Sequence, residues 1–164
     1  MVVERSGDFL GGDGAVDAGQ LPHHFEGTTP VFQALSGEVQ TGPNIFWILT
    51  ALNYAKSAQN YAWLRDYMPK LRVASNFLFN LLQEIPPLST RAGYDSEGET
   101  LASVPGSLMI DVFLRNNFTT DTNAMLVGFF QEFADAEEFV GNNTGAERLW
   151  SLSDGVKRAM NHHL

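Results

Sequence analysis

The sequence predicts an all-α fold built from two helical hairpins, and three observations support this. Apolar residues recur at helical spacing in two spans, 43–83 and 120–164. Each span contains a short polar turn between two apolar stripes. A hydrophobic content of 44% over 164 residues is enough to bury a core. We therefore expect one domain, with a loop-rich entry (1–42), a first hairpin (43–83), a long loop (84–119) and a second hairpin (120–164).

The entry segment is rich in Gly, Asp, Thr and Pro and shows no sustained periodicity, which predicts loop with a short extended piece. The first helix should begin at Pro43, because Thr41 is a capping type and proline suits the first helical turn. Its predicted course to about Ser57 follows apolar residues that share one face: Ile45, Ile48, Leu49 and Leu52.

The second helix is expected to start after Asn60, the next capping residue, and to carry an apolar stripe to Gln83. Pro69 interrupts this stripe. Proline removes a backbone donor and clashes with the preceding turn. The sequence therefore predicts either a kink near Asp66 or a short helix followed by a longer one.

The second hairpin should open at Asp121, following two threonines, and its first helix should stop at Gly141. Its last helix should start at Thr144, which has capping-box spacing with Glu147. Between the hairpins, 84–119 contains several prolines and glycines and no helical period. Loops of this length in compact helical proteins usually carry function or are disordered.

Charge and composition exclude several classes of protein. Acidic residues outnumber Lys and Arg by 19 to 10, so nucleic acid is a poor candidate partner. With no cysteine, disulfides and thiol chemistry are excluded. No segment has the unbroken apolar length of a membrane span, and the first residues do not resemble a signal peptide, so the compartment is not predicted. Nucleotide-binding glycine motifs are absent, and we expect no cofactor.

The four histidines form two adjacent pairs, His23-His24 and His162-His163. Neighbouring residues point in different directions in a strand or a helix, so neither pair by itself predicts a metal site. His23, in a loop with proline and phenylalanine, could instead line a ligand pocket.

Two stretches carry a resemblance to a known superfamily. The sequence FTTDTNAMLV from Phe118, followed by FADAEEFVGN from Phe133 and AMN at 159–161, resembles the six-hairpin (α/α) glycosidases, including α-L-rhamnosidase-like enzymes. The earlier GQLPHHF from Gly19 and TGPN from Thr41 are similar to the substrate loop and helix entry of a preceding hairpin. The resemblance implies an (α/α) toroid. Because such a barrel needs six hairpins, the chain is expected to form an incomplete barrel, with self-association through exposed barrel faces.

The resemblance also implies glycoside hydrolysis by two carboxyl groups, one acidic and one ionised, with a neutral glycoside or oligosaccharide as substrate and inversion as the expected outcome. Asp111 is the first candidate acid, because its apolar neighbours could raise its pKa. The alternative is a turn-capping aspartate. Asp121 is the second candidate, although a carboxylate at a helix start is already explained by the free N–H groups there.

Other residues are candidates for binding sugar. Asn123 could bond a hydroxyl from the mouth of the helix, and Trp47 could stack on a sugar face, although packing in the core is favoured for Trp47. Asp95 and its neighbours Glu97 and Glu99 are expected to form a solvated face, with a catalytic role for one of them as the alternative, and Asp95 is also a candidate for binding sugar. Glu38, ahead of the first helix, is a comparable candidate. The rival hypothesis is a non-catalytic helical-repeat module that binds a protein partner.

Overall fold

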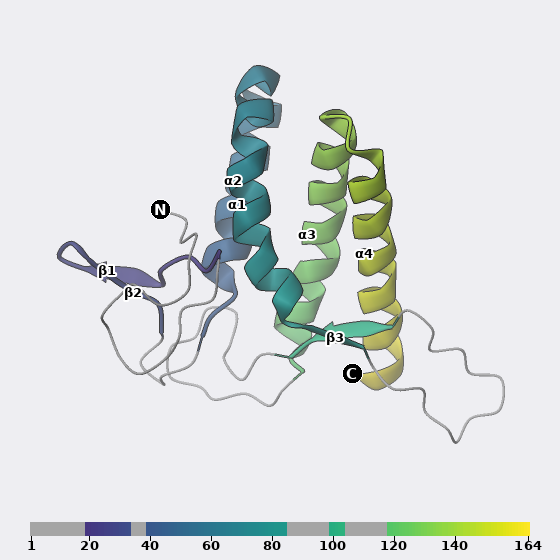
Figure 1. The fold of residues 1–164 in the computed structure, drawn as a ribbon. Helices are drawn as coiled ribbons and strands as arrows, with labels where there is room; N and C mark the ends of the chain where they lie inside the picture. Colours follow the sequence, from purple (N-terminus) through teal and green to yellow (C-terminus); the bar gives the residue numbers. More distant parts are fainter. Residues whose placement is uncertain (1–18, 34–38, 85–98, 104–117) are drawn as a thin grey trace.

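The computed structural model describes residues 19–33, 39–84, 99–103 and 118–164, and these are mainly helical. The predicted helical class is therefore confirmed (Figure 1). The helices of the described part are α1 (Gly42–Ser57), α2 (Tyr61–Asn80), α3 (Thr120–Phe139) and α4 (Asn143–His163). The short strands are β1 (His24–Glu26), β2 (Thr29–Val31), β3 (Leu82–Glu84) and β4 (Thr100–Ala102).

The helices form two antiparallel hairpins, α1–α2 and α3–α4, that lie side by side (Figure 1). The first helices of the hairpins, α1 and α3, are in contact and run in the same direction. Two antiparallel strand pairs, β1–β2 and β3–β4, lie at the end of the bundle where α1 and α3 begin. One end of the bundle thus carries the strand pairs, and the other carries the two short turns.

The two helical turns have the same backbone geometry. In each turn the middle residue adopts a left-handed conformation, with φ of 51° at Gln59 and 87° at Gly141. The next residue, Asn60 or Asn142, bonds back to the preceding helix through its own N–H. Its side chain then caps the following helix by accepting a backbone N–H at 3.3 Å in α2 and 3.2 Å in α4. The hairpins can therefore be aligned by placing Asn60 on Asn142.

The second helix departs from its prediction in two ways. Of the two predicted alternatives, a short helix followed by a longer one is wrong, because α2 is one helix with Pro69 on its exposed side, where water can satisfy the carbonyl left without a donor. The kink near Asp66 stays a prediction. The helix also ends at Asn80, before the predicted Gln83. Residues 82–84 form β3 and pair with β4, so that Leu82 lies opposite Ala102. Pairing with a distant segment has overridden a local helical pattern.

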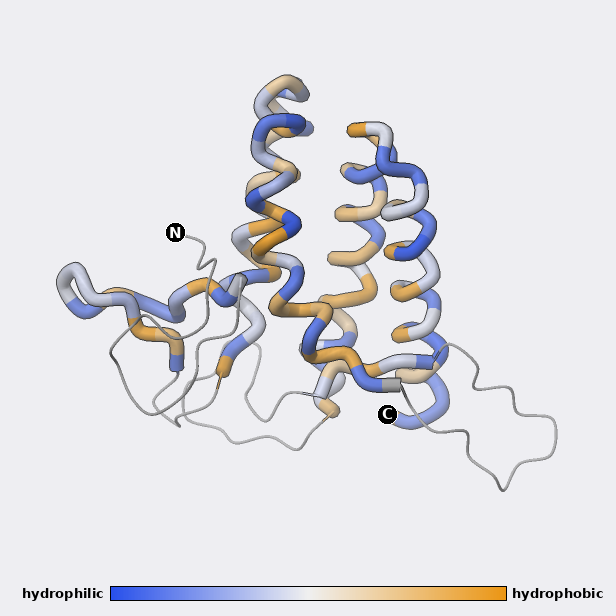
Figure 2. Tube along the Cα trace, in the orientation of Figure 1, coloured by the Kyte–Doolittle hydropathy of each residue, from blue (hydrophilic) through white to orange (hydrophobic). Residues whose placement is uncertain are grey.

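The core lies between the hairpins, and Figure 2 shows hydrophobic positions facing the middle of the bundle. Burying one such side chain fully contributes roughly 1.5–3 kcal/mol. The α2 and α4 sequences are amphipathic, whereas α1 is apolar around most of its circumference. The largest fully buried side chains are Phe77, Phe129, Phe130, Phe133, Ile45, Ile48, Leu52, Met68, Leu71, Leu78, Leu101 and Leu126.

Asn44, buried at the start of α1, fixes the entry segment to the bundle. Its amide nitrogen donates to the carbonyl oxygens of Gly19 at 2.8 Å and Ala74 at 2.9 Å. Its amide oxygen accepts the N–H of Leu21 at 3.0 Å. Gly19 has φ of 87°, and a Cβ there would lie 1.9 Å from the carbonyl oxygen of Val73, so only glycine fits. These contacts hold 19–21 against α2.

Candidate functional site

Among the described residues, a group of ionisable and hydrogen-bonding side chains surrounds β4, at the end of the bundle where α3 begins and α4 ends (Figure 1). Asn123 holds the strand from the α3 side. Its amide nitrogen donates to the carbonyl oxygens of Ala102 at 3.2 Å and Thr119 at 2.9 Å. Its amide oxygen accepts the N–H of Ala102 at 2.7 Å. Because Asn123 is fully buried and its amide is committed to the backbone, we assign it to positioning β4.

Glu99 holds the same segment from the α4 side. Its side chain is 0% exposed, so the expected solvated face is wrong for this residue. One carboxylate oxygen lies 2.6 Å from Nδ1 of His162, and the other lies 2.9 Å from Nε2 of His163. When Glu99 is ionised it can only accept, and the contacting nitrogen of each ring then carries the proton.

The two histidines reach one carboxylate even though adjacent residues of a helix point in different directions. They do so by using different ring nitrogens, Nδ1 of His162 and Nε2 of His163. A carboxylate bonded to an imidazole fixes the ring's orientation and tautomer, the arrangement that acid–base histidines use. Glu99 is buried, whereas the His162 side chain is 40% exposed. The cluster therefore places a carboxylate-oriented imidazole at the surface.

Asp121 lies in the first turn of α3, at the same end of the bundle. Its Oδ1 accepts the N–H of Thr122 at 2.9 Å, and the side chain is half-buried. The start of a helix stabilises a negative charge through its free N–H groups. The start of α3 therefore gives Asp121 a structural role. The position also places a carboxylate on the helix whose Asn123 binds β4.

The remaining predicted site residues divide into described and undescribed ones. His23 is half-buried before β1, with Nδ1 2.7 Å from Nδ1 of His24. Trp47 is half-buried against the hydrophobic core on α1. The others lie outside the described residues: Glu38, Asp95 and Asp111. Within the described ranges, no group of three or more His, Asp or Glu side chains could hold a metal ion.

A second polar cluster joins the hairpins in a groove of about 190 Å³ between α2 and α4. Arg72 binds Glu137 through two hydrogen bonds of 2.8 and 2.6 Å, and Asn142 donates to the same carboxylate at 2.8 Å. The hydrogen bond to Glu137 raises the pKa of Arg72, against an opposing effect of burial. Because Glu137 is buried and fully bonded, we interpret this cluster as a structural tie between the hairpins.

No protein-family model, curated protein or solved structure matches the chain. Among the described helices, none combines the length and apolar character needed to cross a bilayer. What the fold and site define is thus a mainly helical protein of paired hairpins, with a buried glutamate–histidine cluster at one end.

Proposed function

We propose that the chain is part of an (α/α)-toroid glycoside hydrolase that cleaves a neutral glycoside or oligosaccharide. One observation carries the proposal: the first helices of the two hairpins, α1 and α3, lie next to each other and run in the same direction. Repeating this step side by side produces an inner ring of first helices and an outer ring of second helices. The apolar circumference of α1 and the amphipathic character of α2 and α4 fit these two positions.

The strand-bearing end of the bundle is the proposed catalytic end. Both strand pairs lie there, together with the Glu99 cluster and Asp121. Loops and strand ends held by a rigid scaffold are common locations for catalytic residues. Two buried asparagines, Asn44 and Asn123, bind extended segments to the first helices at this end through hydrogen bonds to the backbone. They give the segments the fixed positions that a binding site needs.

Two carboxylates are required across the scissile bond, about 6.5–9.5 Å apart when a water must attack between them. We propose Asp111 as the general acid, because it is flanked by apolar residues in the sequence, and apolar surroundings favour a protonated carboxyl group. Asp121 is the second candidate, and the partner carboxylate across the scissile bond is not assigned. His23, Trp47, Asp95 and Glu38 remain proposed sugar-binding residues. Asn123 leaves that group, because its amide is already bonded to the backbone.

A second candidate function is a non-catalytic helical-repeat module, and the matched turns at Gln59 and Gly141 favour it. Repeats with short turns of one geometry are typical of modules that bind proteins through stacked faces. The two functions differ in what they do with sugar. The module needs none, whereas the hydrolase binds it at the strand-bearing end.

The testing experiment is a screen of neutral aryl glycosides and oligosaccharides for hydrolysis by the natural polypeptide that contains this sequence. The proposal predicts turnover of at least one glycoside, with an inverted anomeric product by NMR. Retained configuration would contradict the inverting mechanism. No turnover and no saturable sugar binding across the screen would reject the hydrolase in favour of the module.

A further inference from the structure

The matching turns allow α1 and α3 to be compared position by position. Placing Asn60 on Asn142 aligns three residues of α1 with three of α3: Trp47, Thr50 and Tyr54 with Phe129, Glu132 and Ala136. Glu132 forms an ion pair with Lys56, so this flank of α3 faces α1. Phe129 and Ala136 share the flank by their helical spacing from Glu132, and both are buried. The aligned flank of α1 is much more open, since Thr50 is exposed and Tyr54 is 49% exposed.

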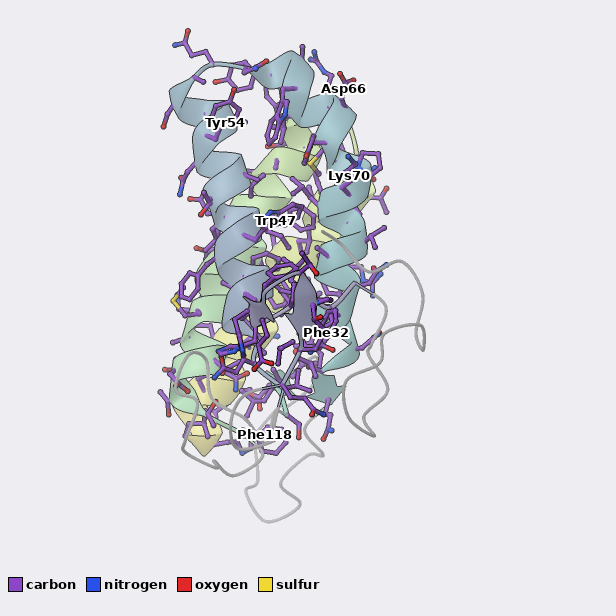
Figure 3. The ribbon with its side chains drawn as sticks, turned by 90° about the vertical axis from the view of Figure 1, so that its left-hand side faces the viewer. Phe32, Trp47, Tyr54, Asp66, Lys70 and Phe118 are labelled. Atoms are coloured by element: carbon purple, nitrogen blue, oxygen red, sulfur yellow. The ribbon has the colours of Figure 1, made fainter. Side chains whose placement is uncertain are left out.

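This open flank of α1 has the composition of a covered surface. Lys56 is the single charged residue in the helix, and it is already paired with α3. Phe46 and Tyr54 are 36% and 49% exposed, and Tyr54 also packs edge-on against Trp63 of α2. Figure 3 shows Trp47 and Tyr54 on the same helix. Solvent-facing sides of surface helices normally carry charges. An uncharged flank with exposed aromatic rings therefore indicates a partner.

The residues of α1 that face α3 can also be aligned with residues of α3. They identify the flank of α3 on which the α1 flank of another hairpin would pack. Leu49 and Lys56 of α1 share the flank that meets α3, and they align with Gln131 and Glu138. Gln131 is exposed, and it borders a groove of about 380 Å³ between α3 and α4. The groove is lined by Ala124, Val127, Gln131, Lys157, Met160 and Asn161.

Gly128 lies beside this groove, in the middle of α3. Within the described part of the chain, a Cβ at Gly128 would meet no atom closer than 4 Å. Glycine inside a helix costs about 1 kcal/mol relative to alanine, and the described packing supplies no reason for it. A second helix approaching this flank closely would supply one, because small residues allow close backbone approach.

We propose that the α1 flank of one copy, formed by Phe46, Thr50 and Tyr54, docks head to tail on the α3 flank of a second copy. The aromatic rings of α1 fill the groove beside Gly128. Thr50 of one copy then lies opposite Glu138 of the next copy. This contact corresponds in position to the ion pair between Lys56 and Glu132 within one chain. The two surfaces differ, so the contact is heterologous and builds rings or open chains. In the proposed toroid, the hairpins next to these two flanks would then belong to other copies of the chain. The self-association does not depend on sugar chemistry.

Two blocked variants test this arrangement. Thr50→Glu places an acid opposite Glu138 and disables the α1 flank only. The double variant Gly128→Arg, Gln131→Arg fills the groove and disables the α3 flank only, at exposed positions that leave the core intact. Ser151→Glu, which adds the same charge to an exposed position of α4, is the matched control for Thr50→Glu. Circular dichroism confirms that each variant keeps its helices.

Sedimentation velocity from micromolar to millimolar concentration gives the readout. The unaltered chain and Ser151→Glu should associate, each blocked variant alone should stay monomeric, and their equal mixture should form a dimer that grows no further. Thr50→Lys should tighten association about two- to fivefold, since an exposed ion pair with Glu138 contributes up to about 1 kcal/mol. Adding Glu138→Lys should reverse that gain.

Three results would overturn the proposal: an unaltered chain that is monomeric throughout, continued self-association of Thr50→Glu, or a mixture of blocked variants that stays monomeric. The last result would indicate a contact between identical surfaces, because such a contact cannot be restored by mixing.

Discussion

Asn123 and Ala102 are joined by two hydrogen bonds that run in opposite directions. The Asn123 amide oxygen accepts the Ala102 N–H at 2.7 Å, and its amide nitrogen donates to the Ala102 carbonyl at 3.2 Å. A side chain from α3 thereby acts as the neighbouring strand for one residue of β4. Asn44 binds the entry segment in a comparable way at the start of α1.

Replacing Asn123 with Asp should lower the free energy of unfolding by about 2–4 kcal/mol. The new carboxylate keeps the size of the side chain, yet it cannot donate to the carbonyls of Ala102 and Thr119 and would be buried beside both. Urea denaturation followed by circular dichroism measures the change. Asn143→Asp is the control, because that exposed residue lies in the first turn of α4, where a negative charge is mildly favourable. Equal stability of Asn123→Asp and the unaltered chain would show that Asn123 does not hold β4 in place.

Replacing Glu99 with Gln should loosen the end of α4, since one amide cannot accept from both histidines as a carboxylate does. The expected loss of stability is about 1–3 kcal/mol. Hydrogen exchange should show faster exchange of the last helical turn, around His162 and His163. Glu147→Gln, at an exposed position of the same helix, should leave exchange there unchanged. Unchanged protection in Glu99→Gln would show that the cluster does not anchor α4.

The loss of stability should differ according to which partner of the Arg72–Glu137 pair is replaced. Arg72→Met leaves a buried carboxylate with Asn142 as its remaining described donor and should cost about 2–4 kcal/mol. Glu137→Gln should cost about 1 kcal/mol, because Arg72 is partly exposed and water can solvate it. The double variant should lose less than the two single losses combined. A larger loss for Glu137→Gln would contradict this account.

The same pair should be insensitive to alkali. The folded-state pKa of Arg72 is raised above an already high ordinary value, so its contribution is fully present below the unfolded pKa and is lost only above the folded one. The difference in unfolding free energy between Arg72→Met and the unaltered chain should therefore stay constant between about pH 7 and 10.

Gly128→Ala should stabilise the monomer by about 0.5–1 kcal/mol, because alanine is the better helix former and the described surroundings leave room for its methyl group. Thermal unfolding at micromolar concentration measures this without association. Gly141→Ala is the contrasting variant: φ at Gly141 is 87°, so alanine should destabilise the turn by about 1 kcal/mol. A destabilised Gly128→Ala would mean that α3 is already closely packed there.

The helices were predictable because their signals are local. Apolar spacing predicted both hairpins, and Asn60 was recognised as a cap from its type and position. Other features depend on distant partners. Leu82 fits a helical stripe as well as a strand, and only its pairing with Ala102 decides between them. Glu99 lies in an acidic, glycine-containing stretch that reads as solvated, and its burial depends on histidines near the end of α4. Nothing near Glu99 in the sequence signals that contact.

Asp111→Asn is the most direct test of the proposed glycoside hydrolysis with Asp111 as the general acid. The variant is made in the natural polypeptide that contains this sequence, and kcat is measured on glycosides of good and poor leaving groups. We predict a fall in kcat of about 10² to 10⁴ for poor leaving groups, because general acid catalysis acts in the transition state. Nitrophenyl glycosides, which need less protonation, should be affected far less, and the melting temperature should not change. A lowered melting temperature with equal impairment of both substrate types would contradict the assignment.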